Sequence, residues 1–371
     1  LTGMMLADLG AEVIKIENPE GGDPFRSFRG GTYSAHFTGY NRGKRGMTLN
    51  LREAAGRAIA LDLIKRSDVL IENFRPDVMG RLGLDAATIA AANPRLIHAS
   101  ITGFGATGPY AERPAFDSVG VALSGMGSLF FDRDNADMRG PTIVDNVTGM
   151  YCCYGILGAL YDRTTSGRGR RIEVNMLEAA IGFIPDPFAN WFRRGVEQGP
   201  YSRTESSQSF VFPCADGKLI AVHLSSQEKF WMGMLKAIER VDLAADARFR
   251  TRPDRMTNYL VLREELARAF VTRERSVWLG RLADEDVPFA PVNAVSEVAD
   301  DPQVRHHGTF YEVTHPTEGK QTAIHRPVHI DGRRGPTRLA APTHGEHTNE
   351  ILAELGMTAD AIQALRAKGI V

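Results

Sequence analysis

The sequence has little of what marks several large classes of protein. Its 371 residues carry 44 Lys and Arg against 45 Asp and Glu, so no overall field favours nucleic acid or an anionic membrane surface. The longest apolar run, Gly149 to Tyr161, is too short to cross a bilayer, and no signal peptide is visible. We therefore expect neither a nucleic-acid partner nor a membrane partner.

Cysteine is scarce, and histidine is scattered. The cysteines are Cys152, Cys153 and Cys214. None belongs to a CxxC pair, so a disulfide framework is not expected, and this usage is typical of the reducing cytoplasm. The pairs His325/His329 and His344/His347 have no cysteine and no third ligand beside them, so we expect no metal site.

Several familiar nucleotide and hydrolase motifs are also absent. No GxGxxG follows a predicted strand, and no GxxxxGK[ST] is present, which excludes the usual dinucleotide fingerprint and the P-loop. Ser124 and Gly125 belong to no GxSxG elbow, the motif that positions the nucleophile of α/β-hydrolases.

What the sequence does contain is an alternation of strand and helix patterns. Short β-branched runs predict strands at 11–17, 47–51, 69–71, 96–101 and 171–174. Helical spacing between them predicts helices at 52–66, 78–82, 86–92 and 145–161. This order favours an α/β fold with a Rossmann-like parallel sheet and helices on both faces, and such sheets bind ligands beyond the carboxyl ends of their strands.

The composition changes after the first half of the chain. Residues 1–194 form the predicted large domain, and the polar, glycine- and serine-rich stretch 195–209 is typical of a linker. Residues 210–329 alternate again between strand and helix patterns. They predict a smaller α/β domain.

Asp145 is the residue with the most suggestive position, because it opens the predicted long helix. One interpretation is an N-cap, since Asp is among the preferred residues there. The other is a carboxylate nucleophile, held ionised by the helix end and close to backbone N–H groups that can stabilise an oxyanion. The residues alone leave both open.

Cations and glycines gather near the predicted strand ends. Lys44 and Arg45 precede one strand, and Arg75 and Arg81 follow another. They are either solvated surface charges or a phosphate clamp, because guanidinium and ammonium groups match phosphate oxygens. The glycine-rich segment Gly103–Pro109 permits close backbone approach to a ligand.

Motifs along almost the whole chain, in a fixed order, resemble those of the family III CoA-transferases, also called the CaiB/BaiF family. The matching segments are Met5–Glu17, Asn41–Arg45, Glu72–Pro76, Ile101–Gly105, Gly108–Tyr110, Arg113–Pro114, Val144–Asp145, Gly167–Gly169, Val287–Pro288, Ala290–Val292, Asp301–Val304 and Gly345–Thr348. The family includes formyl-CoA and carnitine CoA-transferases and α-methylacyl-CoA racemases.

The resemblance implies a fold, an assembly and a reaction. The large domain would be completed by residues 330–371, and two subunits would interlock as a homodimer. The family begins with a further strand, which we expect to precede Leu1. The implied reaction transfers coenzyme A from an acyl-CoA to a carboxylic acid through an aspartyl-CoA intermediate, with no tightly bound cofactor and with CoA as substrate.

The resemblance also implies roles for individual residues. Asp145 matches the catalytic aspartate, and Asp117 is a candidate for positioning the acceptor acid. The candidate CoA-binding residues are Lys44, Arg45, Asn73, Phe74, Arg75, Arg81, Gly103 and Gly105.

Two other functions stay open from the sequence. The racemases pair the aspartate with a histidine, usually at the place where this chain has Ala115, Phe116 and Asp117. Since Phe116 cannot accept a proton, the usual acid/base pair is absent. A CoA-binding protein without catalysis is the third interpretation.

Overall fold

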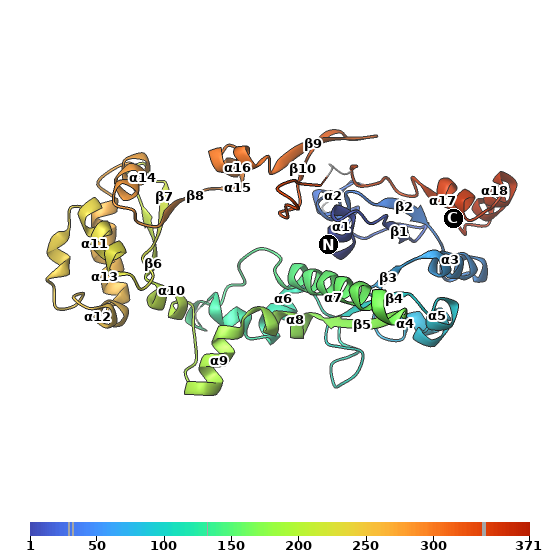
Figure 1. The fold of residues 1–371 in the computed structure, drawn as a ribbon, viewed down its shortest axis with the longest axis horizontal. Coiled ribbons are helices and arrows are strands. Elements are labelled where there is room, and N and C mark those ends of the chain that lie inside the picture. Colours follow the sequence, from blue (N-terminus) through green and yellow to red (C-terminus); the bar gives the residue numbers. More distant parts are fainter. Residues whose placement is uncertain (29, 32, 132, 336–338) are drawn as a thin grey trace. The chain divides into compact units, whose positions relative to one another are not determined.

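The computed structural model describes residues 1–28, 30–31, 33–131, 133–335 and 339–371. The chain forms two compact units (Figure 1). The large unit comprises residues 1–126, 140–185 and 305–371, and the small unit comprises residues 127–139 and 186–304.

The large unit contains two parallel sheets. Strand β1 (Ile14–Glu17) pairs with β2 (Arg45–Thr48), and β3 (Val69–Glu72), β4 (Ile97–Thr102) and β5 (Arg170–Asn175) form the second sheet in the order β3-β4-β5. The predicted α/β class with parallel strands is therefore confirmed. The described strands divide between two hydrogen-bonded sheets, whereas the sequence pattern predicted one.

Helices separate these strands in the chain. They are α1 (Thr2–Asp8), α2 (Ala35–Asn41), α3 (Ala54–Arg66), α4 (Val78–Arg81), α5 (Ala86–Ala92), α6 (Asp117–Leu123), α7 (Val144–Ser166), α8 (Met176–Phe183), α17 (Thr348–Glu354) and α18 (Ala359–Ala367). A short hairpin of β9 (Phe310–His315) and β10 (Gly319–Ile324) precedes the last two helices.

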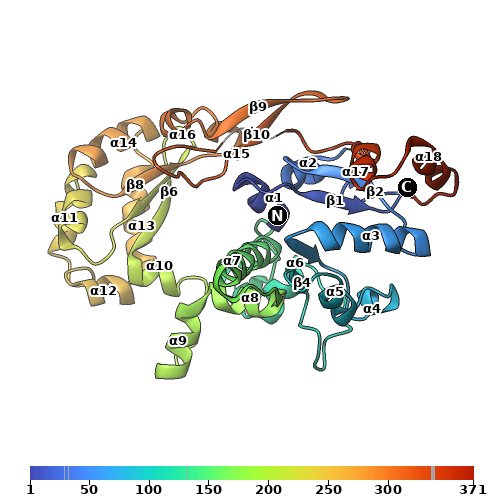
Figure 2. The ribbon, with the colours of Figure 1, turned by 45° about the vertical axis from the view of Figure 1, so that its right-hand side comes forward.

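Helix α7 lies along the β3-β4-β5 sheet (Figure 2). Its Cys152, Cys153 and Ile156 are buried with Ile97 and Ala99 of β4. The adjacent pair of cysteines is thus core, as small apolar side chains usually are. The helix ends at Gly167, which adopts a left-handed conformation with φ 67°, a backbone state that glycine enters without steric cost.

A second core in the large unit joins residues far apart in the sequence. Ile59 and Ile64 of α3 and Ile89 of α5 are buried with Ile351 and Leu352 of α17. The end of the chain therefore packs against β2 and α3 (Figure 2), which a linear reading of the sequence does not reveal.

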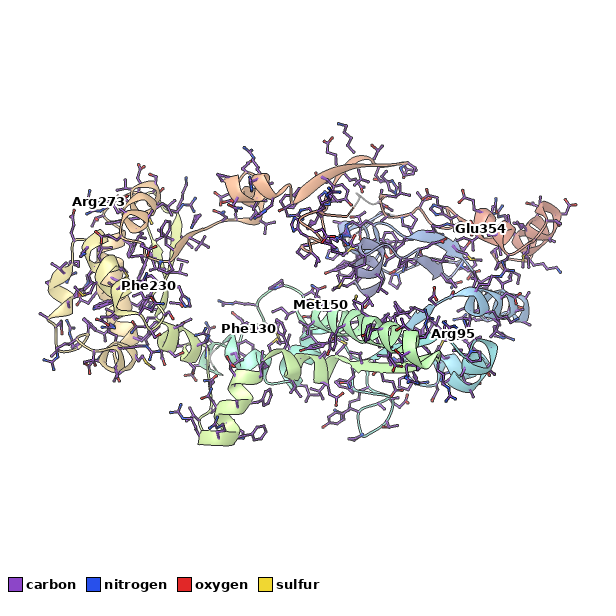
Figure 3. All side chains as sticks on the ribbon, in the orientation of Figure 1. Arg95, Phe130, Met150, Phe230, Arg273 and Glu354 are labelled. Atoms are coloured by element: carbon purple, nitrogen blue, oxygen red, sulfur yellow. The ribbon has the colours of Figure 1, made fainter. Side chains whose placement is uncertain are left out.

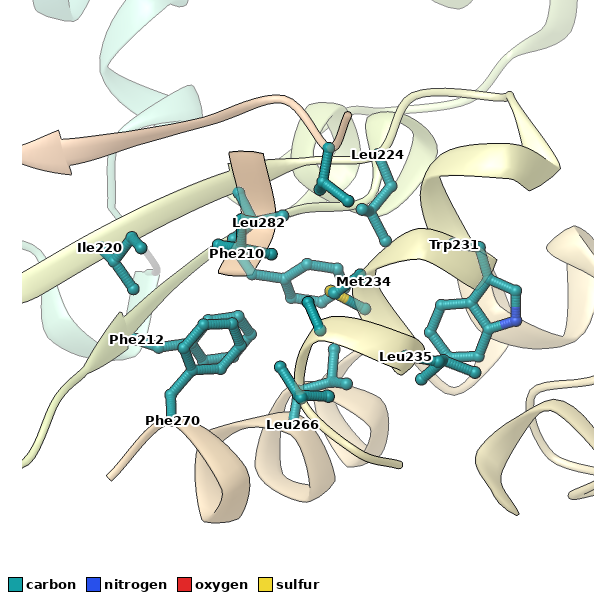
Figure 4. Close-up of a cluster of buried hydrophobic side chains, with 14 of the residues drawn as sticks. Phe210, Phe212, Ile220, Leu224, Trp231, Met234, Leu235, Leu266, Phe270 and Leu282 are labelled. Carbon is teal, nitrogen blue, oxygen red and sulfur yellow. The ribbon is translucent and has the colours of Figure 1, made fainter. Parts of the chain in front are cut away.

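The small unit is built on an antiparallel sheet of β6 (Ser209–Pro213), β7 (Leu219–His223) and β8 (Phe289–Val292). Its helices are α9 (Pro185–Arg194), α10 (Ser202–Ser207), α11 (Glu228–Ala237), α12 (Arg252–Thr257), α13 (Tyr259–Phe270), α14 (Arg275–Asp284) and α15 (Val295–Val298), and α16 (Pro302–His307) crosses into the large unit. Its core is aromatic (Figure 4), with the rings of Phe212 and Phe270 stacked at 4.4 Å between centroids.

The observed boundaries differ from the predicted ones at three places. The small unit begins at 186 and includes 127–139, and the chain returns to the large unit at 305. The sequence predicted a large domain that ends at 194, a small domain over 210–329 and a return to the large domain at 330. The expected linker 195–209 contains the helix α10. Pro185 and Pro187 begin α9, because proline lacks only an N–H that the first helical turn does not use.

Within the described residues, none of the helices combines the length and apolar character that a membrane crossing requires.

The aromatic core of the small unit makes a direct stability prediction. Phe270 is fully buried against Phe212 and Trp278, so Phe270→Ala should cost about 3–5 kcal/mol through lost burial and a cavity. Calorimetry would measure this as a lower Tm. Val241→Ala, at a side chain that is 56% exposed, is the control and should leave Tm almost unchanged; equal effects of the two substitutions would contradict the assigned core.

Candidate functional site

The carboxyl ends of β3 and β4 bring several predicted residues to one edge of the sheet. Glu72 is paired with Ser100 in the parallel register, so the segment after β3 lies beside the last residues of β4. Asn73, Phe74 and Arg75 are exposed there.

Glu72 holds the segment that follows β3, and the sequence analysis did not single it out. One oxygen of its carboxylate accepts the backbone N–H of Phe74 at 2.9 Å, although the Glu72 side chain is only 8% exposed. The sequence signal that could have predicted this contact is an acidic residue directly at the end of a strand. Side chains of short polar and acidic residues at such positions commonly accept the backbone N–H two residues further along the chain.

Gly103 and Gly105 shape the segment that follows β4. A Cβ on Gly103 would lie 2.2 Å from the Cβ of Ala115, and Gly105 has φ +100°, so both positions require glycine. The Gly105 N–H donates to the hydroxyl of Thr102 at 3.0 Å. These two glycines therefore determine the conformation of the turn after β4. Their contact with CoA stays a prediction.

The long helix begins one residue earlier than predicted. Its N-cap is Ile143, whose side chain makes no capping hydrogen bond, and Asp145 lies within the first turn. The interpretation of Asp145 as the N-cap is therefore wrong. Asp145 is exposed, and its side chain does not cap the helix.

Asp117 supplies part of the capping that Ile143 cannot. One oxygen of its carboxylate accepts the backbone N–H of Asp145 at 3.1 Å. This N–H belongs to the first turn, where helix donors have no partner within the helix. Asp117 is itself in the first turn of α6, with Phe116 as the N-cap.

A glycine allows α6 to approach α7 closely enough for this bond. A Cβ at Gly120 would lie 2.7 Å from a methyl group of Val144, so any larger residue would push the helices apart. Farther along α7, the hydroxyl of Thr2 donates to the carbonyl oxygen of Gly149 at 2.9 Å. The start of α7 is thus held from two sides.

The electrostatics of Asp145 are opposite to those expected. Although Asp145 is exposed, partial desolvation of its carboxyl by the surrounding protein and the nearby charge of Asp117 raise the pKa of this carboxyl above its ordinary value, whereas the helix end alone would lower it. Removing solvent from a carboxylate and placing a second carboxylate beside it both penalise the charged form. The ionised Asp145 is therefore a more basic carboxylate than a free one.

The four candidate cations fall into two groups. Lys44 donates to the side-chain oxygen of Asn41 at 2.7 Å, and burial together with the charge of Lys15 lowers its pKa to about 7. Arg45 forms ion pairs with Glu12, which precedes β1, and with Glu354, which belongs to α17. The second pair ties β2 to α17.

Arg75 and Arg81 are exposed, and within the described part of the chain their side chains have no hydrogen bond or ion pair. These two arginines are therefore the candidates whose charge is available to a phosphate group. Asn73 and Phe74 lie directly before Arg75 in the same segment.

Among the described residues, no three His, Cys, Asp or Glu side chains come together in a way that could hold a metal ion. Of the histidines considered in the sequence, His325 stacks on the ring of Tyr311 with centroids 4.3 Å apart. His344 contacts the carbonyl oxygen of Asn18 at 3.0 Å.

The sequence pattern of CoA-transferase family III matches residues 1–348. The chain belongs to this family. It is a CoA-transferase, and its reaction class is the transfer of CoA between acyl-CoA thioesters and carboxylic acids.

Named relatives agree with this assignment. An acetyl-CoA:oxalate CoA-transferase of Acetobacter aceti is 36% identical over 305 residues, which cover 81% of this chain and 78% of the relative. A formyl-CoA:oxalate CoA-transferase of Escherichia coli O157:H7 is 31% identical and is covered to 93%, with 98% of this chain aligned.

The fold agrees as well. The crystal structure of a CaiB/BaiF family protein from Brucella suis superposes with a TM-score of 0.85 at 30% identity, and the match covers 95% of this chain and 94% of that protein. The family resemblance noted in the sequence is confirmed.

The contact between Asp117 and Asp145 predicts a shift in pH dependence. Asp117→Asn keeps an oxygen acceptor for the Asp145 N–H but removes the charge that raises the Asp145 pKa. The predicted role of Asp145 requires its ionised carboxylate, so activity should fall as pH drops through this pKa, and in the variant the acid limb of the kcat/KM profile should move to lower pH.

Asp117→Ala is the matched variant, since it removes the charge and also the acceptor. We expect the same pH shift with an additional loss of about 1 kcal/mol of stability, the usual cost of a lost helix cap. An unchanged acid limb in both variants would contradict the assigned influence of Asp117 on Asp145.

Proposed function

We propose that the chain transfers CoA through a covalent aspartyl-CoA intermediate formed on Asp145. The observation that carries this proposal is the position of the Asp145 carboxylate, which is exposed in the first turn of α7 and has a raised pKa. A reactive carboxylate must be both accessible and basic, and this one is both.

The first half of the reaction loads the enzyme. An oxygen of the Asp145 carboxylate attacks the thioester carbonyl carbon, the C–S bond breaks, and a mixed anhydride and CoA thiolate result. The thiolate then attacks the Asp145 carbonyl carbon of the anhydride. The donor acid leaves as its carboxylate, and Asp145 carries CoA as a thioester.

The second half is the same chemistry in reverse. The acceptor carboxylate attacks the aspartyl thioester, CoA thiolate leaves, and the thiolate attacks the acceptor carbonyl carbon of the new anhydride. The products are the acceptor acyl-CoA and the free Asp145 carboxylate. No net proton is taken up or released, and the chemistry needs no tightly bound cofactor.

Backbone N–H groups of the first turn of α7 are the proposed donors to each tetrahedral oxyanion, because helix starts carry N–H groups without intrahelical partners. Asp117 occupies the N–H of Asp145, so the remaining donors must come from its neighbours. The predicted role of Asp117 toward the acceptor acid stays a prediction, beside its contact with Asp145.

For CoA itself we propose the edge of the β3-β4-β5 sheet. Arg75 and Arg81 offer open charges for the phosphates, and the glycine turn after β4 allows the ligand close to the backbone. Direct contacts by Asn73, Phe74, Gly103 and Gly105 are part of the same proposal. Lys44 and Arg45 are weaker candidates, because their side chains already have partners.

Racemisation is a poorer fit to the site. Phe116, where the racemases carry the histidine, is a hydrocarbon ring that is 74% exposed at the N-cap of α6. It neither accepts nor donates a proton, so a two-base exchange at the α-carbon has no second base there.

Intact mass measurement tests the covalent intermediate. The chain is mixed with acetyl-CoA, formyl-CoA or succinyl-CoA in the absence of acceptor, and we expect an adduct of CoA mass that hydroxylamine removes. Oxalate, named for two of the relatives, is the first acceptor to test for discharge of the adduct.

Asp145→Asn is the control, since it keeps the shape and removes the nucleophile. It should form no adduct and should lose at least about 1,000-fold in kcat, while Asn146→Asp in the same turn should still load. An adduct that persists in Asp145→Asn would overturn the assignment. Exchange of the α-proton into heavy water without an adduct would favour the racemase reaction, and CoA binding without either signal would favour a non-catalytic binder.

We also propose that the chain works as a homodimer of the interlocked family type. The outer face of α7 carries a stripe of large apolar side chains at helical spacing, Met150, Tyr154, Leu157 and Tyr161, with exposed fractions of 52%, 76%, 42% and 80%. Figure 3 labels Met150 on this helix. Exposed aromatic stripes of this kind are typical of subunit interfaces.

Light scattering after size exclusion tests the assembly. We expect twice the chain mass for the parent protein, and a shift toward the monomer for the double variant Tyr154→Glu/Tyr161→Glu, because two carboxylates would be buried without partners. Val295→Glu, at a side chain that is 94% exposed in the small unit, is the control. A monomeric parent protein would contradict the proposal.

A further inference from the structure

Three arginines from distant parts of the sequence meet at the end of α1 in the large unit. Arg42 follows α2, whereas Arg326 and Arg334 follow the β9-β10 hairpin. Arg42 donates to the carboxylate of Asp8 at 2.6 Å, and Arg326 donates to the main-chain oxygen of the same residue at 2.6 Å. Their guanidinium groups are therefore neighbours.

The third guanidinium joins through the main chain. Arg334 donates to the carbonyl oxygen of Arg326 at 2.9 Å, and Gly335 brings the backbone against the Arg326 side chain, since a Cβ there would lie 3.0 Å from its Cζ. Arg42 also donates to the carbonyl oxygen of Ile324 at 3.0 Å, which ties the group to the end of β10.

Each of the three side chains keeps a buried N–H without a partner among the described residues. The nitrogens are Nη1 of Arg42, Nε of Arg326 and Nε of Arg334. The side chain of Arg42 is only 8% exposed. Buried N–H groups of charged side chains are costly to leave unpaired, so three in one place point to an acceptor that the protein itself does not provide.

The charges of this cluster do not balance either. Three guanidinium groups are permanently positive, and the carboxylate among their contacts in the described chain is that of Asp8. The neighbouring His325 senses this positive charge: burial, together with the charges of Arg334 and Arg42, lowers its pKa. The net excess of about two positive charges matches a divalent oxyanion.

We propose that Arg42, Arg326 and Arg334 form a binding site for a phosphate-type oxyanion, separate from the reaction at Asp145. Oxygens of a tetrahedral dianion would accept the three unpaired N–H groups and neutralise the excess charge. A bound anion would add to the hydrogen bonds that already join the C-terminal segment to α1 and Arg42, so it links anion concentration to the stability of the large unit.

The site does not coincide with the nucleophile. Thr2, at the start of α1, contacts α7 at Gly149, one helical turn from Asp145. Asp8 is at the other end of this 7-residue helix, about 10 Å away at 1.5 Å per residue. The proposal therefore stands whether or not Asp145 carries CoA, and it is tested by binding rather than by activity.

Thermal unfolding of the whole chain tests it with inorganic phosphate as the probe, at constant ionic strength set by sodium chloride. In about 10 mM phosphate we expect Tm to rise by about 3 °C, with a saturable dependence on concentration. Sulfate should act similarly and acetate should not. Arg334→Met and Arg326→Met should abolish the rise.

The matched control is Arg52→Met, which removes an exposed arginine whose side chain has no partner among the described residues. It should keep the full response. In phosphate-free buffer the two cluster variants should remain folded with a Tm close to that of the parent, because each loses one hydrogen bond to a main-chain oxygen but also removes an excess positive charge. If one variant fails to fold, the other carries the comparison.

The anion could be free or part of CoA, and the same variants separate the two sources. A free anion leaves the Kd of CoA unchanged in Arg334→Met while the phosphate response is lost. A parallel loss of CoA affinity, with dephospho-CoA less affected, would place a CoA phosphate in the same site. A phosphate response absent from the parent, or retained in both cluster variants, would overturn the proposal.

Discussion

The start of helix α7 is the constraint on which the site depends. This helix must lie flat on the β3-β4-β5 sheet and at the same time bring its first turn against α6 and α1. Both approaches are possible because Gly120 and Gly149 have no side chain at the points of contact. Once α6 is that close, the Asp117 carboxylate reaches the Asp145 N–H, and its charge adds to the desolvation that raises the pKa of the Asp145 carboxyl.

Two electrostatic effects compete at Asp145. The helix end favours the charged carboxylate, by at most about 1 kcal/mol at an exposed site. Desolvation and the like charge of Asp117 oppose it and determine the direction of the pKa shift. In the proposed mechanism this carboxylate attacks a thioester, which is already an activated acyl group. A moderately basic carboxylate suffices for such chemistry, so the proposed mechanism needs one carboxylate rather than a separate base and nucleophile.

The arginines and lysine of the large unit have different duties although they look alike in the sequence. Arg45 fastens β2 to α17 through Glu354, and Lys44 is held by Asn41. Arg75, just after β3, and Arg81, at the end of α4, remain exposed and are the cations proposed to meet a phosphate. Arg42 belongs to neither group, because it meets two arginines from the C-terminal segment. The charge of these side chains does not distinguish their roles. The roles differ because each side chain has a different contact partner in the folded structure.

The sequence by itself determined the strand–helix alternation, the order of the family motifs and the identity of Asp145 and Gly103 as special positions, because these are properties of neighbouring residues and of spacing. It could not decide that Asp145 lies inside the first turn rather than at the cap, since the competing capping group, Asp117, is 28 residues away. It could not place residues 127–139 in the small unit, nor bring Arg326 and Arg334 to Arg42. Contacts between residues far apart along the chain arise only when the cores close, and they decided which charges are paired, which carboxylate is basic and which cations are left for a ligand.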